Sequence, residues 1–187
     1  MPEQQKKTSP RARVLAAGAV AVLAAGTVGA LSANAAEPAA KPATTAPVTD
    51  RDHLTRTTHL TVDAATQAAQ AALKAAAEEG RRVTVAVVDR NGNTVVVLRG
   101  DGAGPQSYES AQRKAFTAVS WNAPTSALAE RLESAPNLKD IPGTLFLGGG
   151  VPVTASGAPV AGIGVAGAPG GDLDEKYARA GAAALAG

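Results

Sequence analysis

The sequence predicts an α+β domain in which helices flank an antiparallel, five-stranded sheet. Three observations support this prediction. An alanine-rich run with helical spacing leads into two β-branched runs joined by Asn91-Gly92, and the glycine-rich C-terminal half holds three more short β-branched runs. The expected order, α-β-β-α-α-β-β-β-α, also lacks the regular β-α-β alternation that a parallel sheet requires.

The first expected helix begins after Thr61, whose hydroxyl is suited to cap a helix N-terminus. Gly80 ends the helix, because glycine readily adopts the positive φ of a C-terminal cap. Between them, apolar residues recur every three or four positions: Val62, Ala65, Ala69, Ala72, Leu73 and Ala76. This spacing predicts one apolar face packed on a sheet.

A β-hairpin follows the helix. Residues 83–89 read VTVAVVD and residues 94–98 read TVVVL, both rich in β-branched side chains. The intervening Asn91-Gly92 pair favours a tight turn. We therefore expect two antiparallel neighbours in the sheet.

Two helices come next. Residues 107–121 lack glycine and proline, and Ser107 or Ser110 is the expected cap. Pro124 ends this helix, and Thr125 is expected to cap a shorter one that runs to about Ser134. The loop at 136–142 follows.

The C-terminal part predicts three strands and a helix. The strands cover residues 144–147, 151–154 and 159–165, and glycine-rich turns separate them. Asp172 opens a helix to about Leu185, since acidic side chains are favourable at a helix N-terminus.

The first 35 residues have the three parts of a secretory signal peptide. A basic start precedes an uncharged run at 14–31, and Ala33 and Ala35 provide the small residues that a signal peptidase recognises. We expect cleavage after Ala35 and a secreted, extracellular protein. The alternative is an N-terminal membrane anchor, because a run of this length approaches that of a membrane span.

The formal net charge of the 187-residue chain, +2, is dominated by this leader. Residues 1–35 contain four of the 18 basic residues and one of the 16 acidic ones, which leaves a net charge of −1 on the remainder. Nucleic acid is therefore not an expected partner. Residues 36–53 are rich in alanine and proline and predict a flexible tether, so the expected folded domain is 54–187.

The chain contains no cysteine, and its one methionine is Met1. This composition excludes a thiolate nucleophile, a cysteine zinc site and an iron–sulfur cluster. Residues 162–167 match G-x-G-x-x-G, but they lie within the last expected strand and no helix follows directly. We interpret these glycines as sites of close backbone packing, and not as a dinucleotide motif.

Two pairs of side chains are candidates for metal binding. His53 and His59 both lie before the first helix, where no third ligand is nearby in the sequence, so solvated side chains are the simpler interpretation. Glu130 and Glu133 are three residues apart and share one helix face. Such a pair is either a solvated surface or a surface site for ferric iron.

Six ordered blocks resemble the GlcG/HbpS family, also called the haem-degrading domain family, and the match covers essentially the whole of residues 54–187. The first block runs from Leu60-Thr61-Val62 through AALKAAAEEG, and the others are VTVAVVDRNGN, SAQRKAFTAVSWNAPT, LFLGGGVPV, APVAGIGVAG and DLDEKYARAG. The resemblance implies a profilin- or PAS-like fold, haem binding and homo-oligomers, which are octamers in the haem-binding branch. The signal peptide and tether are more similar to that extracellular branch than to the cytoplasmic members.

The same resemblance implies a role and a set of site residues. In the haem-binding branch the protein is an accessory haem or redox sensor for a membrane histidine kinase, and surface iron binding and slow haem breakdown are also attributed to it. A threonine hydroxyl is the axial contact there, which we map to Thr117 of the KAFTA block. Phe116 and Trp121 would supply apolar walls, and Arg113 or Lys114 would pair with the propionates.

We therefore expect an exported, oligomeric haem-binding protein that passes haem or redox status to a membrane partner. The alternative is a small secreted enzyme that degrades haem or acts on a hydroxyacid or another tetrapyrrole, although no convergent acid–base set is evident. A third hypothesis is a structural oligomer whose pocket is vestigial. If Thr117 does not bind the iron, His53 and His59 are the alternative ligands.

Overall fold

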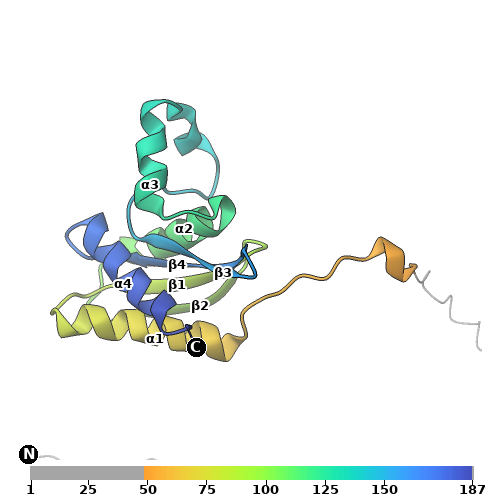
Figure 1. Ribbon diagram of the computed structural model, residues 1–187. Coiled ribbons are helices and arrows are strands. Elements are labelled where there is room, and N and C mark those ends of the chain that lie inside the picture. Colours follow the sequence, from red (N-terminus) through yellow and green to blue (C-terminus); the bar gives the residue numbers. More distant parts are fainter. Residues whose placement is uncertain (1–48, 187) are drawn as a thin grey trace, which may run out of the picture. The chain divides into compact units, whose positions relative to one another are not determined.

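The computed structural model describes residues 49–186, which belong to one compact unit that begins at Thr49 (Figure 1). The predicted signal peptide, its cleavage after Ala35 and residues 36–48 of the predicted tether lie outside the described residues. The remaining tether residues include a short 3₁₀ turn at Arg51–His53, and an extended segment then leads to the first helix. None of the helices between residues 49 and 186 is long and apolar enough to cross a membrane.

Four antiparallel strands form a single sheet in the order β2-β1-β4-β3, with helices on both faces (Figure 1). The strands are β1 (Thr84–Asp89), β2 (Thr94–Arg99), β3 (Gly150–Ala155) and β4 (Ala158–Ala166). The helices are α1 (Val62–Glu78), α2 (Gln106–Trp121), α3 (Thr125–Glu130) and α4 (Gly171–Ala183), with short 3₁₀ turns at Arg131–Glu133 and Pro136–Asp140. The predicted α+β class and antiparallel pairing are confirmed.

Alternation along β1 divides the core between two layers. Val85 and Val87 pack with α1 and α4 on one face, while Ala86 and Val88 pack with α2 on the other. Both faces of β1 are therefore covered, which explains why residues 84–88 are all alanine or β-branched.

The predicted caps of α1 are confirmed. The Thr61 hydroxyl accepts a hydrogen bond from the backbone N–H of Ala64, and Gly80 takes a φ of +68° directly after the helix. The alanines of the predicted apolar face are buried under α4 and the sheet.

The β1–β2 hairpin is also confirmed, with Val85 opposite Leu98. Asp89 holds the turn, because its carboxylate accepts hydrogen bonds from the backbone N–H groups of Asn91 and Asn93. Gly92 has a φ of +87°, which glycine adopts without strain.

The first two glycines of the G-x-G-x-x-G match, Gly162 and Gly164, lie where α2 crosses β4. A Cβ at Gly162 or Gly164 would collide with the backbone carbonyls of Ala115 and Ala111. These glycines therefore allow a helix to lie close against the sheet, as the sequence interpretation proposed.

The prediction of five strands is wrong, because residues 144–147 form a loop and not a strand. Side chains of α2 satisfy the backbone of this loop. The carbonyl of Thr144 accepts a hydrogen bond from Arg113, and the N–H of Leu145 donates to the Thr117 hydroxyl. A β-branched and aromatic composition thus reflects burial here, and not strand pairing.

Three helix boundaries also differ from the predictions. Thr125 does not cap α3, since its hydroxyl accepts from the Gly150 N–H, and α3 ends at Glu130 before a 3₁₀ turn. Ser107 lies inside α2 and not at its cap, where its hydroxyl bonds Gly104 and Thr84. In both cases the hydroxyl that the local sequence predicts as a helix cap forms a hydrogen bond with a residue of another element.

Candidate functional site

The outward face of α2 carries a row of side chains spaced by one helical turn. Tyr108, Gln112 and Phe116 occupy positions i, i+4 and i+8, so they lie along one stripe of the helix. A shallow hollow of about 190 Å³ opens beside this stripe. Its lining residues are Val88, Gly92, Thr94, Gln112, Arg113, Phe116 and Gly143.

Phe116 forms the apolar floor of this hollow. Its ring lies against Gly92 of the hairpin turn and Gly143 of the loop after the 3₁₀ turns, and a Cβ at Gly92 would come within 2.9 Å of the ring. The two glycines thus leave room for a half-buried aromatic ring between a hairpin and a loop.

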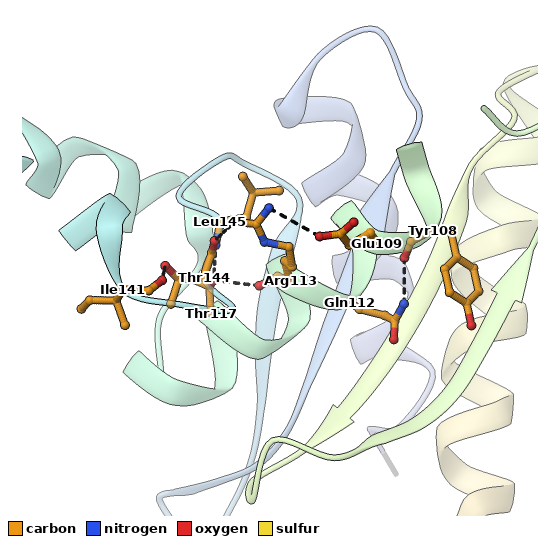
Figure 2. Close-up of polar contacts among 8 residues, drawn as sticks. All are labelled: Tyr108, Glu109, Gln112, Arg113, Thr117, Ile141, Thr144 and Leu145. Atoms are coloured by element: carbon orange, nitrogen blue, oxygen red, sulfur yellow. Dashed lines mark hydrogen bonds and ion pairs between the residues drawn. The ribbon is translucent and has the colours of Figure 1, made fainter. Parts of the chain in front are cut away.

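Arg113 lines the hollow and places a cation there, and Figure 2 shows its polar contacts. One guanidinium nitrogen donates to the carbonyl of Thr144 at 2.7 Å, and another lies 3.8 Å from the carboxylate of Glu109. The Arg113 side chain keeps 40% of its surface exposed. The guanidinium is therefore oriented by the protein yet open to an anionic group from solvent.

Thr117 lies behind this surface and not on it. Its hydroxyl donates to the Arg113 carbonyl at 2.7 Å and accepts from the Leu145 N–H at 2.8 Å, and the residue is fully buried. Figure 2 shows these contacts joining α2 to the 141–145 loop. The hydroxyl predicted as the axial contact thus joins α2 to this loop, and its contact with haem stays a prediction.

Lys114 is equally enclosed, although it is the neighbour of Arg113 in sequence. Its ammonium is 2.7 Å from the carboxylate of Asp174 and 3.1 Å from the carbonyl of Val165. Burial raises the pKa of Asp174, while the Lys114 ammonium and the Ala168 N–H act in the opposite direction. Lys114 is thus part of the core, and its ammonium contacts Asp174 and Val165; its predicted contact with a propionate stays a prediction.

Trp121 closes the last turn of α2. Its ring meets that of Phe146 edge to face, with centroids 5.3 Å apart at 67°. This contact holds the 144–147 loop against α2. Trp121 thus supports the loop whose Thr144 carbonyl binds Arg113.

Glu130 and Glu133 lie at the end of α3 and in the following 3₁₀ turn, and both are exposed. Between residues 49 and 186, no group of three or more His, Cys, Asp or Glu side chains is arranged to hold a metal ion. The two glutamates are thus a solvent-facing pair that lies on α3 and the turn after it, and not on the α2 stripe.

The two histidines lie away from the α2 face. His53 is exposed in the N-terminal 3₁₀ turn. His59 bonds Thr57 at 2.8 Å and lies 3.7 Å from the carboxylate of Asp89. Since Asp89 alternates with Val88, its side chain faces the α1 layer, opposite the hollow.

Of the predicted site residues, Arg113 and Phe116 line the hollow, whereas the sequence reasoning did not name Tyr108, Glu109 and Gln112 on the same helix. The missed residues lie one or two turns before the predicted ones, so the i, i+4 spacing of an exposed helix stripe could have revealed them. Thr144 could not be found in this way, because it belongs to a loop and lies 31 residues after Arg113 in the sequence.

Comparison with known proteins identifies related chains. The family model "Haem degrading protein HbpS-like" matches residues 60–183. A solved HbpS from Streptomyces reticuli, a double mutant with aspartate in place of two glutamates three residues apart, is 76% identical. The match covers 76% of this chain and 98% of that chain, with a TM-score of 0.74.

More distant relatives share the same fold. A solved complex of PduOC with haem is 26% identical over 68% of this chain and 95% of that chain, with a TM-score of 0.63. An uncharacterised 15.0 kDa protein from the dhaT–dhaS intergenic region of Citrobacter freundii is 31% identical over 113 residues, which cover 58% of this chain and 80% of that protein. With a family model that spans nearly all of the folded unit, the chain belongs to the HbpS-like haem-degrading family.

Proposed function

We propose that this protein is a secreted haem-binding protein that reports haem or redox status to a membrane sensor kinase. The family match over residues 60–183 carries the proposal. The solved PduOC–haem complex, which shares the fold at 26% identity, adds support for the ligand.

The α2 face suits the two chemical parts of haem. Phe116 and Val88 provide apolar contact for a porphyrin edge, and the exposed Arg113 guanidinium suits a propionate. The hollow, at about 190 Å³, is smaller than the ~300–1,000 Å³ of pockets that enclose small ligands. Phe116, Val88 and Arg113 would therefore hold one edge of a porphyrin.

Bound haem would supply a redox-active iron, and the chain's own residues would hold it. The Thr144 carbonyl fixes the direction of the Arg113 guanidinium, which lowers the entropy lost when an anion binds. Thr117 in turn holds the loop that carries Thr144, through its bond to Leu145. The buried hydroxyl thus acts as a positioning group for the cation.

Titration with hemin tests the proposal directly. The purified chain that begins at Ala36 is expected to shift the hemin Soret band and to saturate at one haem per chain. Absence of any shift would remove haem as the ligand.

A charge variant tests the site. Arg113→Gln keeps an amide donor near Thr144 but removes the cation, so hemin affinity is expected to fall about tenfold (~1.4 kcal/mol). Arg131→Gln, at an exposed arginine of the 3₁₀ turn after α3, is the matched control and should bind hemin normally. Equal affinity for the two variants would place the propionates elsewhere.

Export and assembly are further parts of the proposal. The N-terminal sequence supports cleavage after Ala35, with an uncleaved membrane anchor as the alternative, and mass spectrometry of the protein from culture medium distinguishes them. The family resemblance supports a homo-octamer, which light scattering of the purified protein tests.

We also propose a surface site for ferric iron at Glu130 and Glu133. They are the one pair of glutamates three residues apart in this sequence, and the Streptomyces reticuli relative was solved with two such glutamates changed to aspartate. A Glu130→Gln, Glu133→Gln variant should lose ferric binding in equilibrium dialysis, with Glu78→Gln as control. The alternative function, an enzyme that degrades haem, is favoured by the family description, and would be shown by biliverdin release under reducing conditions.

A further inference from the structure

We infer that the cavity at the C-terminal end of α1 is a binding site for a free amino acid with an apolar side chain. Arg81 and Arg82 would pair with the carboxylate of this ligand, and Asp101 would pair with its ammonium group. The cavity shares no lining residue with the α2 hollow, so this site is separate from the proposed haem site.

The cavity has a volume of about 400 Å³, which lies within the ~300–1,000 Å³ of pockets that hold small ligands. Three segments meet around it: the last turns of α1, the link from α1 to β1 and the turn that follows β2. The lining residues are Leu73, Ala77, Gly80, Arg81, Arg82, Gly100 and Asp101. A ligand in this cavity therefore meets both apolar and charged walls.

Three charged side chains line this cavity without pairing with one another. Arg81, Arg82 and Asp101 are all exposed. Within residues 49–186, none of the three side chains takes part in an ion pair. Two cations and one anion thus face the same space but stay apart, and each can pair with a complementary group of one ligand.

The surrounding structure directs both arginines. A Cβ at Gly102, where φ is +74°, would come within 3.0 Å of the Arg82 Cδ and 3.4 Å of its Nε, so this glycine lets the side chain lie along the turn after β2. The neighbouring carboxylate of Glu79 does not bind Arg81, because its two oxygens accept hydrogen bonds from side chains of α4. Contact with the turn restricts the Arg82 side chain, which lowers the entropy lost on binding.

The charges and the apolar wall together select a zwitterion. Two guanidinium groups suit a carboxylate, which they can bind through parallel hydrogen bonds. Asp101 and the partial negative charge at the C-terminal end of α1 suit an ammonium group. A simple anion would gain nothing from these negative charges. Leu73 and Ala77 offer contact to an apolar side chain, and an amino acid carries all three groups.

Isothermal titration calorimetry of the purified protein tests the inference with L-leucine and L-valine as probes. Each probe should bind at one molecule per chain. Isocaproate, which is leucine without its amino group, and isoamylamine, which is leucine without its carboxylate, should each bind about tenfold more weakly than leucine, because one charge-assisted contact is lost.

Two variants distinguish the charged contacts from a general structural effect. Arg82→Gln should weaken both leucine and isocaproate by about tenfold, since both carry the carboxylate. Asp101→Asn should weaken leucine by about tenfold but leave isocaproate unchanged, since that compound has no ammonium group. Arg90→Gln is the matched control, because Arg90 is exposed in the hairpin turn and does not line the cavity, and it should bind leucine normally.

The outcomes are independent of the hemin titration, which tests the other site. The inference is overturned if neither leucine nor valine binds, or if isocaproate binds as tightly as leucine. It is also overturned if Arg82→Gln weakens leucine no more than Arg90→Gln does, since the amino acid would then bind elsewhere. Loss of leucine binding in Arg82→Gln and in Asp101→Asn, with isocaproate affected only by the first, supports it.

Discussion

At the scale of single residues, Gly164 determines how closely α2 can lie against the sheet. A Cβ there would overlap the carbonyl of Ala111 and come within 2.5 Å of the Ala115 nitrogen. These are backbone atoms of a packed helix, so they cannot move aside as a flexible side chain would. The Tyr108 and Arg113 side chains depend on this helix position, since both extend from α2.

Gly164→Ala is therefore expected to destabilise the fold by about 3 kcal/mol, the upper range for overpacking. Urea denaturation measures the loss. The control is Gly157→Asn, because position 157 has open space and a φ of +79° that asparagine tolerates. Equal stability of the Gly164 variant and wild type would mean that α2 lies farther from β4 than described.

Adjacent residues in one helix show how far sequence could predict the site. Arg113 and Lys114 are consecutive and both were assigned to propionates, yet a 100° turn of the helix directs one to solvent and the other to the core. The sequence contains no local signal for Asp174, which lies 60 residues later. Charge type is thus predictable from sequence, whereas the partner of each charge depends on tertiary structure.

At the scale of elements, the β1–β2 hairpin was predicted with its turn, because the β-branched runs and Asn91-Gly92 are local signals. The strand predicted at 144–147 was wrong for the opposite reason. Its hydrogen-bond partners are the side chains of Arg113 and Thr117, about 30 residues earlier, and no local pattern encodes them. Elements stabilised by local backbone hydrogen bonds can therefore be predicted from the sequence, whereas segments held by distant side chains cannot.

The hairpin turn gives a pH-dependent prediction through Asp89. Burial of this carboxylate raises its pKa, but hydrogen bonds from Asn93 and Asn91 outweigh this and, together with the charge of His59, hold the pKa below its usual value. The ionised form therefore stabilises the fold above the pKa of the unfolded chain, about 3.9. This stability is lost as the pH falls through the lower pKa of the folded state.

Asp89→Asn should thus cost about 1 kcal/mol near pH 7, because the amide oxygen still accepts the two backbone N–H groups but no longer carries the negative charge that strengthens these bonds. The difference from wild type should shrink as the pH falls through the lowered pKa of folded Asp89, because the wild-type carboxyl then becomes neutral as well. Urea denaturation at pH 7 and pH 3 measures the two differences. Asp63→Asn, in the exposed first turn of α1, serves as control, and an equal Asp89 effect at both pH values contradicts the assigned charge.

At the scale of the whole molecule, one buried ion pair joins three elements. Lys114 from α2 contacts Asp174 from α4 and the carbonyl of Val165 in β4, and both charged side chains are about 95% buried. The other oxygen of Asp174 accepts the N–H of Ala168, so both carboxylate oxygens are bonded. The pair therefore connects the helix layers on opposite faces of the sheet at its Val165 end.

Lys114→Met should destabilise the protein by ~3–5 kcal/mol, because it leaves the Asp174 carboxylate buried without its cation. Lys74→Met is the matched control: Lys74 is exposed and lies 4.0 Å from Glu78, so its loss should cost at most ~0.5 kcal/mol. Adding Asp174→Asn to Lys114→Met should recover part of the loss, since the unpaired charge is then removed as well. If Lys114→Met is as mild as Lys74→Met in urea denaturation, Lys114 is available to solvent, and a propionate contact beside Arg113 becomes the better assignment for it.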